Sequence, residues 1–565
     1  MSLPIQWNRV AVMVWAVLAA ALVIVGRLFY LQVVRGSYYD SVAQNQAKEK
    51  VEVDLPRATL LDRRGVPVAA SVHCPSLYTF DPQKIQDPRG LASAVAAISG
   101  RDADDILKDL RTRKRFTWLA RKLPFEKYEE AKALCRRFKG CEFMEESGRF
   151  YPNGEVAANL VGCVGTDGGL AGLEHQWNSK LQGGTREYFV MRDAVATRLI
   201  PVGLVPAVDP VPIKIRTTID LPIQYEAERV LGETVNSLDA KDGVAIVLDV
   251  RNGDILAMAV CPTFDPNTPG ASPVAAWRNR AVTDSYEPGS TFKLVTLAAA
   301  LDTGRFQPTD TVYVGDGTLT VGPKTIHDDE PPIKPVYTLE EVLAHSSNVG
   351  AAKVGLAVGE QTMYRYMQIL GFGKVTALGL SGETAGLLRP PKDWSLLSLP
   401  SLSFGQELRA TPLQLILAYA DVASGGYRVV PRLIPDAAVP PPERILKATT
   451  AQALTEMLRQ VVTDGTGKAA AIPGISVAGK TGTAQKLGVR SPDGRRLFIA
   501  YFVGFAPAQD PRLAVLVMVD EPLGKIYGGS VSAPCFAKIM AFALRHVNSP
   551  PAPPDTDVAL AGDVP

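Results

Sequence analysis

A hydroxyl and an amine lie three residues apart at the start of an apolar segment of this chain. Ser290 and Lys293 form an S-x-x-K pattern, and the apolar run Leu294–Leu301 follows directly. Pro288 and Gly289 end the preceding loop, so we expect Ser290 at a helix N-terminus. Residues three apart share a helix face, and a helix N-terminus favours negative charge on oxygen. The spacing therefore predicts an amine within reach of a serine nucleophile.

Two further segments make this common pattern specific. Alone, S-x-x-K is expected by chance about once in a chain of this length. Ser346 and Asn348 form S-x-N inside a predicted helical stretch, and Lys480-Thr481-Gly482 forms K-T-G on a predicted strand. A glycine in a strand allows another backbone or a ligand to approach closely. The three motifs, in this order, resemble the S-x-x-K, S-D-N and K-T-G signature of penicillin-recognising serine enzymes.

Lys293 is the base that the spacing offers to Ser290. A serine hydroxyl is a poor nucleophile until a base removes its proton. A free lysine has a pKa of about 10.4, so half of the Lys293 amines are neutral at pH 7 only if that pKa falls to about 7. Burial lowers the pKa of a lysine, and a second cation such as Lys480 lowers it further. We expect Lys293 to be neutral and to act as the general base.

The elements that must position these motifs follow from apolar periodicity. Leu221–Leu238 has helical spacing, and an Asn252-Gly253 turn between two apolar runs is a strong hairpin signal. Strands at both ends of this region, with helices between them, predict one sheet in an α+β arrangement. The predicted strands are Gly243–Val250, Ile255–Val260, Ile475–Gln485, Leu497–Pro507 and Leu513–Val519, and the helical block includes Leu294–Leu301, Leu339–Val358 and Pro412–Ala423.

An N-terminal apolar run predicts a membrane anchor. Val10–Gly26 is uninterrupted, and after Arg27 the apolar character continues to Val34. A spanning helix needs about 20 apolar residues. A cleaved signal peptide is the alternative, but bulky residues stand where it would need small ones. We expect an uncleaved transmembrane helix, although the basic residues that follow it oppose the positive-inside rule.

Composition excludes several classes of protein. The 565 residues include 60 lysines and arginines against 58 aspartates and glutamates, a formal charge of +2 that excludes a globally basic nucleic-acid binder. A hydrophobic share of 46% excludes wholesale disorder. The six cysteines form no C-x-x-C pair and the five histidines are far apart, so we predict no metal site. Cys135 and Cys141 could bridge in an oxidising compartment, or all six cysteines could be unpaired packing residues.

Taken together, the sequence resembles the class B penicillin-binding proteins, bitopic peptidoglycan D,D-transpeptidases, and most of all their division-specific (septal) type. The resemblance extends beyond the catalytic motifs into the family's pedestal. Pro56–Gly65 resembles the first pedestal motif, R-G-x-I-x-D-R-N-G, with Ala58 and Arg64 in place of its Gly and Asn. Further matches are Arg149-Phe150-Tyr151-Pro152 to R-x-Y-P, Gly169–Glu174 to G-x-x-G-x-E, and Tyr527-Gly528-Gly529 to a late Y-G-G turn.

The resemblance implies a fold and a domain organisation. The fold is α+β, with an N-terminal transmembrane helix, an elongated mixed α/β pedestal and a C-terminal transpeptidase domain. In that domain helices flank an antiparallel sheet and form a helical subdomain. The expected parts are a cytoplasmic tail (1–9), the transmembrane anchor (10–34), the pedestal or dimerisation-like domain (35–213), the transpeptidase domain (214–548) and a disordered tail (549–565).

The resemblance also implies roles for the motif residues. The backbone N–H groups of Ser290 and Thr483 would hold the oxyanion. Ser346 would relay a proton to the leaving amine, and Asn348 would bridge Lys293 and the substrate amide. The substrate carboxylate would be bound by the segment Lys480, Thr481, Gly482 and Thr483. Four pedestal residues are expected either as solvated charges or as an ion-pair network coupled to a partner: Arg57, Arg63, Arg149 and Glu174.

Two other polar segments resemble ligand-binding sites, but we do not interpret either of them as one. Asp464–Lys468 resembles a phosphate-binding loop, but Val462 and Ala469 replace the Gly and the Ser or Thr that such a loop requires. His327 with Asp328 and Asp329 could form a metal or acid–base site. We interpret that segment as a polar surface loop.

The predicted function is the cross-linking of stem peptides that end in D-Ala-D-Ala, through a serine acyl-enzyme and without a cofactor, in septal cell-wall synthesis. β-Lactams would acylate Ser290. The alternatives are an elongation-specific transpeptidase, a β-lactamase or carboxypeptidase, and a β-lactam sensor or inactive scaffold. The short interval from Arg149 to Glu174 favours the division-specific type.

Location and partners follow from that function. Peptidoglycan is cross-linked outside the bacterial inner membrane, so we expect a single-pass protein with a periplasmic catalytic domain, at the septum. The resemblance implies a SEDS-family glycosyltransferase and other division proteins as partners, besides the membrane, the stem peptides and β-lactam inhibitors. No nucleic acid is expected.

Overall fold

The computed structural model describes residues 7–39, 48–113, 116–165, 168–183, 185–192, 199–201, 213–376, 378–435 and 440–548. The predicted tail over 549–565, and residues 1–6 of the predicted cytoplasmic tail, lie outside these residues. Packing divides the chain into two compact units. The first comprises Met1–Pro56, His73–Ser147 and Gly183–Pro212, and the second comprises Arg57–Val72, Gly148–Gln182 and Ile213–Pro565. This division follows contacts rather than chain order, and the predicted domain boundaries stay predictions.

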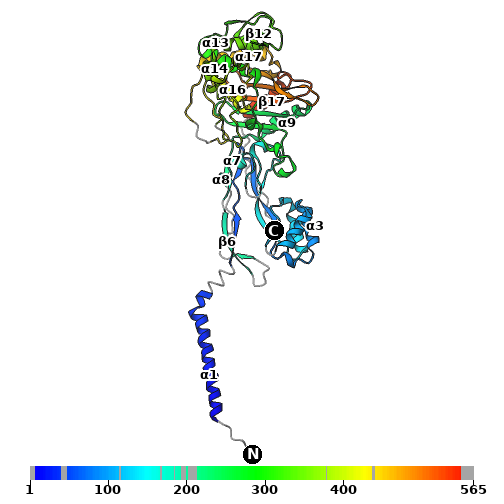
Figure 1. The fold of residues 1–565 in the computed structure, drawn as a ribbon, viewed down its shortest axis with the longest axis vertical. Coiled ribbons are helices and arrows are strands. Elements are labelled where there is room, and N and C mark those ends of the chain that lie inside the picture. The colour runs from blue at the N-terminus through cyan, green and yellow to red at the C-terminus, as the bar shows by residue number, and fades with distance from the viewer. Residues whose placement is uncertain are drawn as a thin grey trace, which may run out of the picture. The chain divides into compact units, whose positions relative to one another are not determined.

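The first unit begins with the helix that we predicted as the anchor. α1 (Trp7–Phe29) continues into a π-helical turn, Tyr30–Val34 (Figure 1). Val10–Val34 is long and apolar enough to cross a membrane, and none of this segment is buried. The guanidinium groups of Arg27 and Arg35 each lie 5.7 Å from the centre of the Tyr30 ring, an arrangement suited to a membrane interface.

The rest of the first unit is mixed α/β. Aspartates at Asp87 and Asp102 cap its first two helices through backbone N–H groups, as the N-cap preference predicts. Its helices are α3 (Pro88–Ser99), α4 (Ala103–Thr112) and α5 (Tyr128–Arg137). Its strands are β1 (Lys48–Asp54), β4 (Thr117–Ala120), β6 (Thr185–Arg192), β7 (Leu199–Pro201) and most of β3 (Pro67–Thr79) and β5 (Glu142–Phe150).

The second unit is built around one antiparallel five-stranded sheet with the order β10-β9-β17-β16-β15. The strands are β9 (Asp242–Asp249), β10 (Ile255–Cys261), β15 (Ala478–Arg490), β16 (Arg496–Ala506) and β17 (Leu513–Asp520). All five predicted strands are confirmed, with ends shifted by a few residues. β9 pairs with β17, so segments about 270 residues apart lie side by side, green against orange-red in Figure 1. The predicted α+β fold is therefore confirmed.

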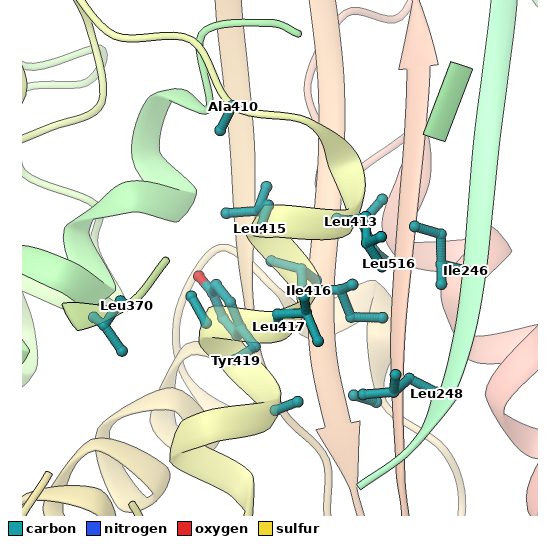
Figure 2. Close-up of a cluster of buried hydrophobic side chains, with 14 of the residues drawn as sticks. Ile246, Leu248, Leu370, Ala410, Leu413, Leu415, Ile416, Leu417, Tyr419 and Leu516 are labelled. Atoms are coloured by element: carbon teal, nitrogen blue, oxygen red, sulfur yellow. The ribbon is translucent and has the colours of Figure 1, made fainter. Parts of the chain in front are cut away.

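Helices cover both faces of this sheet, which is why its strands are apolar without alternation. Ala245 and Val247 of β9 face α9 (Leu221–Ser237) and α18 (Ser532–Asn548), whereas Ile246 and Leu248 belong to the opposite core. On that side α16 (Pro412–Ala423) packs directly on the sheet. Figure 2 shows its Leu413 and Ile416 beside Leu516 of β17 and Ile246.

A helical block lies between the two groups of strands, as predicted, but one predicted helix is wrong as a continuous element. The stretch 339–358 is two helices, α12 (Leu339–Ala344) and α13 (Asn348–Val358). The backbone breaks at Ser346, whose φ is 60°, and Ser347 caps α13 by accepting from the Gly350 N–H at 2.9 Å. The apolar pattern continues across this break, and the sequence pattern therefore did not indicate the turn. The other helices of the block are α11 (Lys293–Asp302), α14 (Glu360–Ile369), α15 (Ser398–Leu402) and α17 (Ala448–Thr463).

Smaller elements complete the second unit. β12 (Thr318–Val321) and β13 (Lys324–His327) form a hairpin, and β11 (Thr311–Tyr313) pairs with β14 (Val336–Thr338). β2 (Thr59–Leu61) pairs in parallel with β8 (Lys214–Arg216). Short helices are α6 (Ala158–Val161), α7 (Gly172–Gln176), α8 (Asn178–Leu181) and α10 (Arg280–Thr283).

Candidate active site

Ser290 lies on a single 3-10 turn, Gly289–Phe292, that leads into α11. Gly289 has a φ of 54°, a conformation that favours glycine, and places the serine at the end of the loop. The Tyr419 hydroxyl of α16 donates to the Thr291 carbonyl at 2.8 Å, which fixes the turn to the core helix. Ser290 is only 9% exposed. The nucleophile candidate is thus held rigidly at a helix N-terminus.

Lys293 is completely buried and gathers four oxygen atoms. Its Nζ lies 2.9 Å from Ser290 Oγ, 2.8 Å from Asn348 Oδ1, 2.5 Å from the Ser346 carbonyl and 3.1 Å from Ser346 Oγ. The carbonyl and the amide oxygen can only accept hydrogen bonds. A neutral amine donates its two N–H groups to them and keeps its lone pair for the Ser290 hydroxyl. The geometry therefore suits proton transfer from Ser290 to Lys293.

Burial shifts the two lysines of the site in the same direction. It lowers the pKa of Lys293 to about 7, and the carboxylates of Asp329 and Asp328 oppose part of this effect. Burial and the neighbouring Lys293 hold the pKa of Lys480 well below its usual range. Two buried amines in one site cannot both carry a charge cheaply. A neutral Lys293 at pH 7 is consistent with this electrostatic environment.

The break between α12 and α13 aims the S-x-N residues at Lys293. The positive φ of Ser346 brings both its carbonyl and its hydroxyl to the amine. Asn348 Nδ2 donates to the His327 carbonyl at 3.0 Å, so Oδ1 must face Lys293. The His327 carbonyl thereby fixes which end of the amide the lysine meets.

Asp328 is a residue of this site that the sequence interpretation missed. Its carboxylate accepts from Ser347 Oγ at 2.8 Å and from the Val349 N–H at 2.9 Å, so it clamps the S-x-N turn from outside. The interpretation of residues 327–329 as a polar surface loop is therefore wrong for Asp328. The loop follows a hairpin that folds back on α13, and no local spacing in the sequence indicates that return.

The K-T-G segment lies on β15, the edge strand beside Ser290. A Cβ on Gly482 would lie 2.8 Å from the Thr291 side chain, which explains why this position is glycine. Lys480 Nζ donates to Thr481 Oγ1 at 3.1 Å. Thr483 Oγ1 accepts from the Gly528 N–H at 3.1 Å, so the Y-G-G turn packs against the strand.

Thr466 is a second residue that the sequence interpretation missed. Its Oγ1 lies 2.6 Å from Thr481 Oγ1 and 3.5 Å from Lys480 Nζ. It belongs to the segment that we rejected as a phosphate loop, and the structure places that segment in the wall of the cleft. The glycines on either side of Thr466 indicated that another segment packs closely there, but they did not indicate which segment.

These elements enclose a cleft of about 490 Å³ that opens over Ser290. Its wall is polar along β15 and acidic along the loop after β13. The lining residues are Ser290, Asp328, Asp329, Glu330, Pro331, Pro332, Ile333, Tyr337, His345, Ser346, Ser347, Asp464, Gly465, Thr466, Thr481, Gly482, Thr483, Tyr527, Gly529 and Ser530. Within the described residues, no group of three or more His, Cys, Asp or Glu side chains could hold a metal ion.

Three of the four predicted pedestal residues form a buried ion-pair network. Glu174 is fully buried and pairs with Arg57 at 2.8 Å and with Arg149 at 2.6 Å. Arg57 also donates to Asn178 Oδ1. The alternative that these three residues are ordinary solvated surface charges is therefore wrong.

Arg63 does not join this network. In the described part of the chain it makes no ion pair with Glu174, and its charge acts instead on the carboxyl of Asp249. The neighbouring Arg64, which replaces the family Asn, lies 3.5 Å from Asp220. The charges of the two arginines therefore act on Asp249, at the end of β9, and on Asp220, the N-cap of α9, rather than on Glu174.

Comparison with known proteins places the chain among homologous sequences over nearly its whole length. The family model of the penicillin binding protein transpeptidase domain matches residues 243–541, and that of the penicillin-binding protein dimerisation domain matches residues 52–200. The chain is 34% identical to the peptidoglycan D,D-transpeptidase FtsI of Escherichia coli K12, an alignment that covers 99% of this chain and 94% of that protein. It is 31% identical to the stage V sporulation protein D of Bacillus subtilis, with 94% and 84% covered.

Solved structures show the same likeness. The crystal structure of penicillin binding protein 3 from Mycobacterium tuberculosis matches with a TM-score of 0.65 and 29% identity, and the match covers 89% of this chain and 99% of that one. Another crystal structure of the same protein, complexed with aztreonam, matches with a TM-score of 0.65 and 28% identity.

Proposed function

Because this chain belongs to the class B penicillin-binding proteins, a family of peptidoglycan D,D-transpeptidases, we propose that it cross-links stem peptides through an acyl-enzyme on Ser290. One observation carries the serine mechanism. The buried Lys293 Nζ lies 2.9 Å from Ser290 Oγ, while oxygens that can only accept occupy its N–H groups.

Acylation begins with attack by Ser290 Oγ on the carbonyl of the penultimate D-alanine. The hydroxyl proton passes to Lys293, and the backbone N–H groups of Ser290 and Thr483 hold the oxyanion. Each such donor is typically worth about 3–4 kcal/mol of barrier. Ser346 Oγ, 3.1 Å from Lys293 Nζ, relays the proton to the nitrogen of the leaving D-alanine.

The terminal carboxylate of the substrate binds along β15. Lys480, Thr481 and Thr483 supply the donors, and Thr466 extends this group through its contact with Thr481. A bound carboxylate raises the pKa of Lys480 toward its usual range, because an opposite charge favours the ammonium form. An amine of a neighbouring stem peptide then attacks the acyl-enzyme, the new amide bond forms and Ser290 regains its proton.

The test is mass spectrometry of the intact protein after exposure to benzylpenicillin. We expect one penicilloyl adduct, located on Ser290, that persists for many minutes, and no adduct on Ser290→Ala. A protein that stays unlabelled, or is labelled at another side chain, contradicts the serine mechanism. Rapid loss of the adduct would favour the β-lactamase alternative instead.

We also propose a septal role, with the catalytic region in the periplasm and a SEDS-family glycosyltransferase and other division proteins as partners. The short interval from Arg149 to Glu174 supports the division-specific type over the elongation-specific one. Val10–Val34 would supply the single membrane pass. Depletion of the protein tests this role, because filamentous cells are expected for a septal enzyme and rounded cells for an elongation enzyme.

A further inference from the structure

Two cysteines of the first unit lie in direct contact. Cys135 is in the last turn of α5, and Cys141 directly precedes β5. Their Sγ atoms are 3.0 Å apart. The connecting turn is held by hydrogen bonds from the Phe138 N–H to the Leu134 carbonyl and from the Cys141 N–H to the Phe138 carbonyl. The backbone itself therefore brings the thiols together.

This is the one sulfur–sulfur contact in the described part of the chain. All six cysteines lie in described residues, and the other four, Cys74, Cys163, Cys261 and Cys535, each stand apart from any second thiol. Three of these four are at most 5% exposed. They supply internal reference thiols that folding keeps separate.

The surroundings of the pair favour a bond. Cys141 is 4% exposed and belongs to the apolar core of the unit with Leu134, while Cys135 is partly exposed at its edge. An S–S bond is about 2.05 Å long, so closing the gap needs about 1 Å of sulfur movement. Because the bond is apolar, it adds no unsatisfied polar group to this core.

We propose that Cys135 and Cys141 form a disulfide bond in the mature protein. The proposal rests on the periplasmic location stated under the proposed function, since thiol pairs are oxidised there and kept reduced in the cytosol. The bond ties the end of α5 to the start of β5 and closes the short basic turn Arg136–Gly140.

The oxidant is a disulfide of the thiol-disulfide oxidoreductase class. The Cys135 thiolate, on the exposed side, attacks one oxidant sulfur and gives a mixed disulfide. Cys141 then attacks the Cys135 sulfur, which releases the oxidant as a dithiol. Two electrons and two protons pass to the oxidant. The hydrogen bond with Cys135, followed by burial, raises the pKa of the Cys141 thiol, which is consistent with Cys135 meeting the oxidant first.

The sequence of the turn allows a sharp test. Trypsin cleaves after Lys132, Arg136, Arg137, Lys139 and Arg149, so a bonded pair survives as peptides 133–136 and 140–149 joined only through sulfur. Full-length protein from membranes is alkylated without reduction, digested and analysed by mass spectrometry. We expect the joined peptides, which separate on reduction and are absent from Cys135→Ser.

A matched control is Cys74→Ser, which removes a buried thiol of the same unit and should leave the joined peptides unchanged. In a second arm, purified full-length protein is reduced and then incubated with oxidised glutathione, where the joined peptides should return. Alkylated thiols at both positions in both arms overturn the proposal. Penicillin labelling of the same samples tests the proposed function separately. Oxidation by glutathione in the second arm depends neither on export nor on Ser290, so the two proposals can fail independently.

Discussion

Proton transfer at Ser290 depends on the charge state of one amine. Burial lowers the pKa of Lys293 to about 7, and the base must be neutral to accept the hydroxyl proton. The neutral fraction rises with pH through about 7. We therefore expect the acylation rate constant with benzylpenicillin to rise about tenfold per pH unit below that value and to level off above it.

The control for this profile is Lys293→Arg, which keeps the charge but cannot form a neutral base. It should acylate at least about 100-fold more slowly at pH 8, the lower range for loss of general-base catalysis. Near wild-type acylation by this variant would exclude Lys293 as the base.

Asp328 and Asp329 are neighbours with different expected roles. Asp328 clamps the S-x-N turn through Ser347 and Val349, and Asp328→Asn replaces one of its two accepting oxygens by an NH₂ donor, which weakens the clamp. Misplacement of the turn should lower the maximal acylation rate, on the plateau of the pH profile, by roughly 10- to 100-fold. Stopped-flow measurement of acylation checks this.

Asp329→Asn is the matched control. Among the described residues, no hydrogen bond joins Asp329 to the turn, and its carboxylate raises the pKa of Lys293. This variant should move the midpoint of the acylation profile to lower pH and keep the maximal rate. Equal effects of the two substitutions would contradict a positioning role for Asp328.

At the scale of elements, the ion pairs of Glu174 hold separate segments of the second unit together. Glu174 of α7 joins Arg57 before β2 and Arg149 at the end of β5. Removing one partner of a buried ion pair typically costs about 3–5 kcal/mol, because the remaining charges stay buried. We expect Glu174→Gln to lower the stability of the unit by this amount, measured as the urea midpoint of tryptophan fluorescence.

An exposed ion pair of the same unit provides the comparison. Glu226 pairs with Arg229 on the surface of α9, at the same 2.8 Å distance as Arg57 and Glu174. Solvent screens such a surface pair, so its loss should lower the stability far less than loss of the buried network. If Glu226→Gln and Glu174→Gln shift the midpoint equally, the buried network adds no more stability than a surface ion pair.

At the scale of the whole molecule, the apolar N-terminal helix and the catalytic centre should be separable. None of Val10–Val34 is buried, so its removal deletes no core contact. A variant without residues 1–34 should stay in solution and acylate within about twofold of the full chain, because the catalytic unit loses no core contact. In cells the same variant should fail to replace the full-length protein. Loss of labelling in the soluble variant would show that the anchor supports the fold.

The sequence by itself determined what depends on short distances along the chain. Helix geometry places Lys293 beside Ser290, and the K-T-G segment was predicted to lie on a strand. Apolar runs and the Asn252-Gly253 turn predicted the sheet strands. These features are local, because hydrogen bonds and side-chain periodicity within a few residues decide them.

Only the tertiary structure decided what depends on segments far apart. The break at Ser346 is invisible in the apolar pattern, because the clamp comes from Asp328, which an intervening hairpin returns to the turn. Thr466 and Asp328 carried no recognisable spacing, since their partners lie 15 and 19 residues away on other elements. Arg63 lies within a motif that resembles the family's first pedestal motif, but it does not join the ion-pair network of Glu174. Long-range packing, not local propensity, selects such contacts.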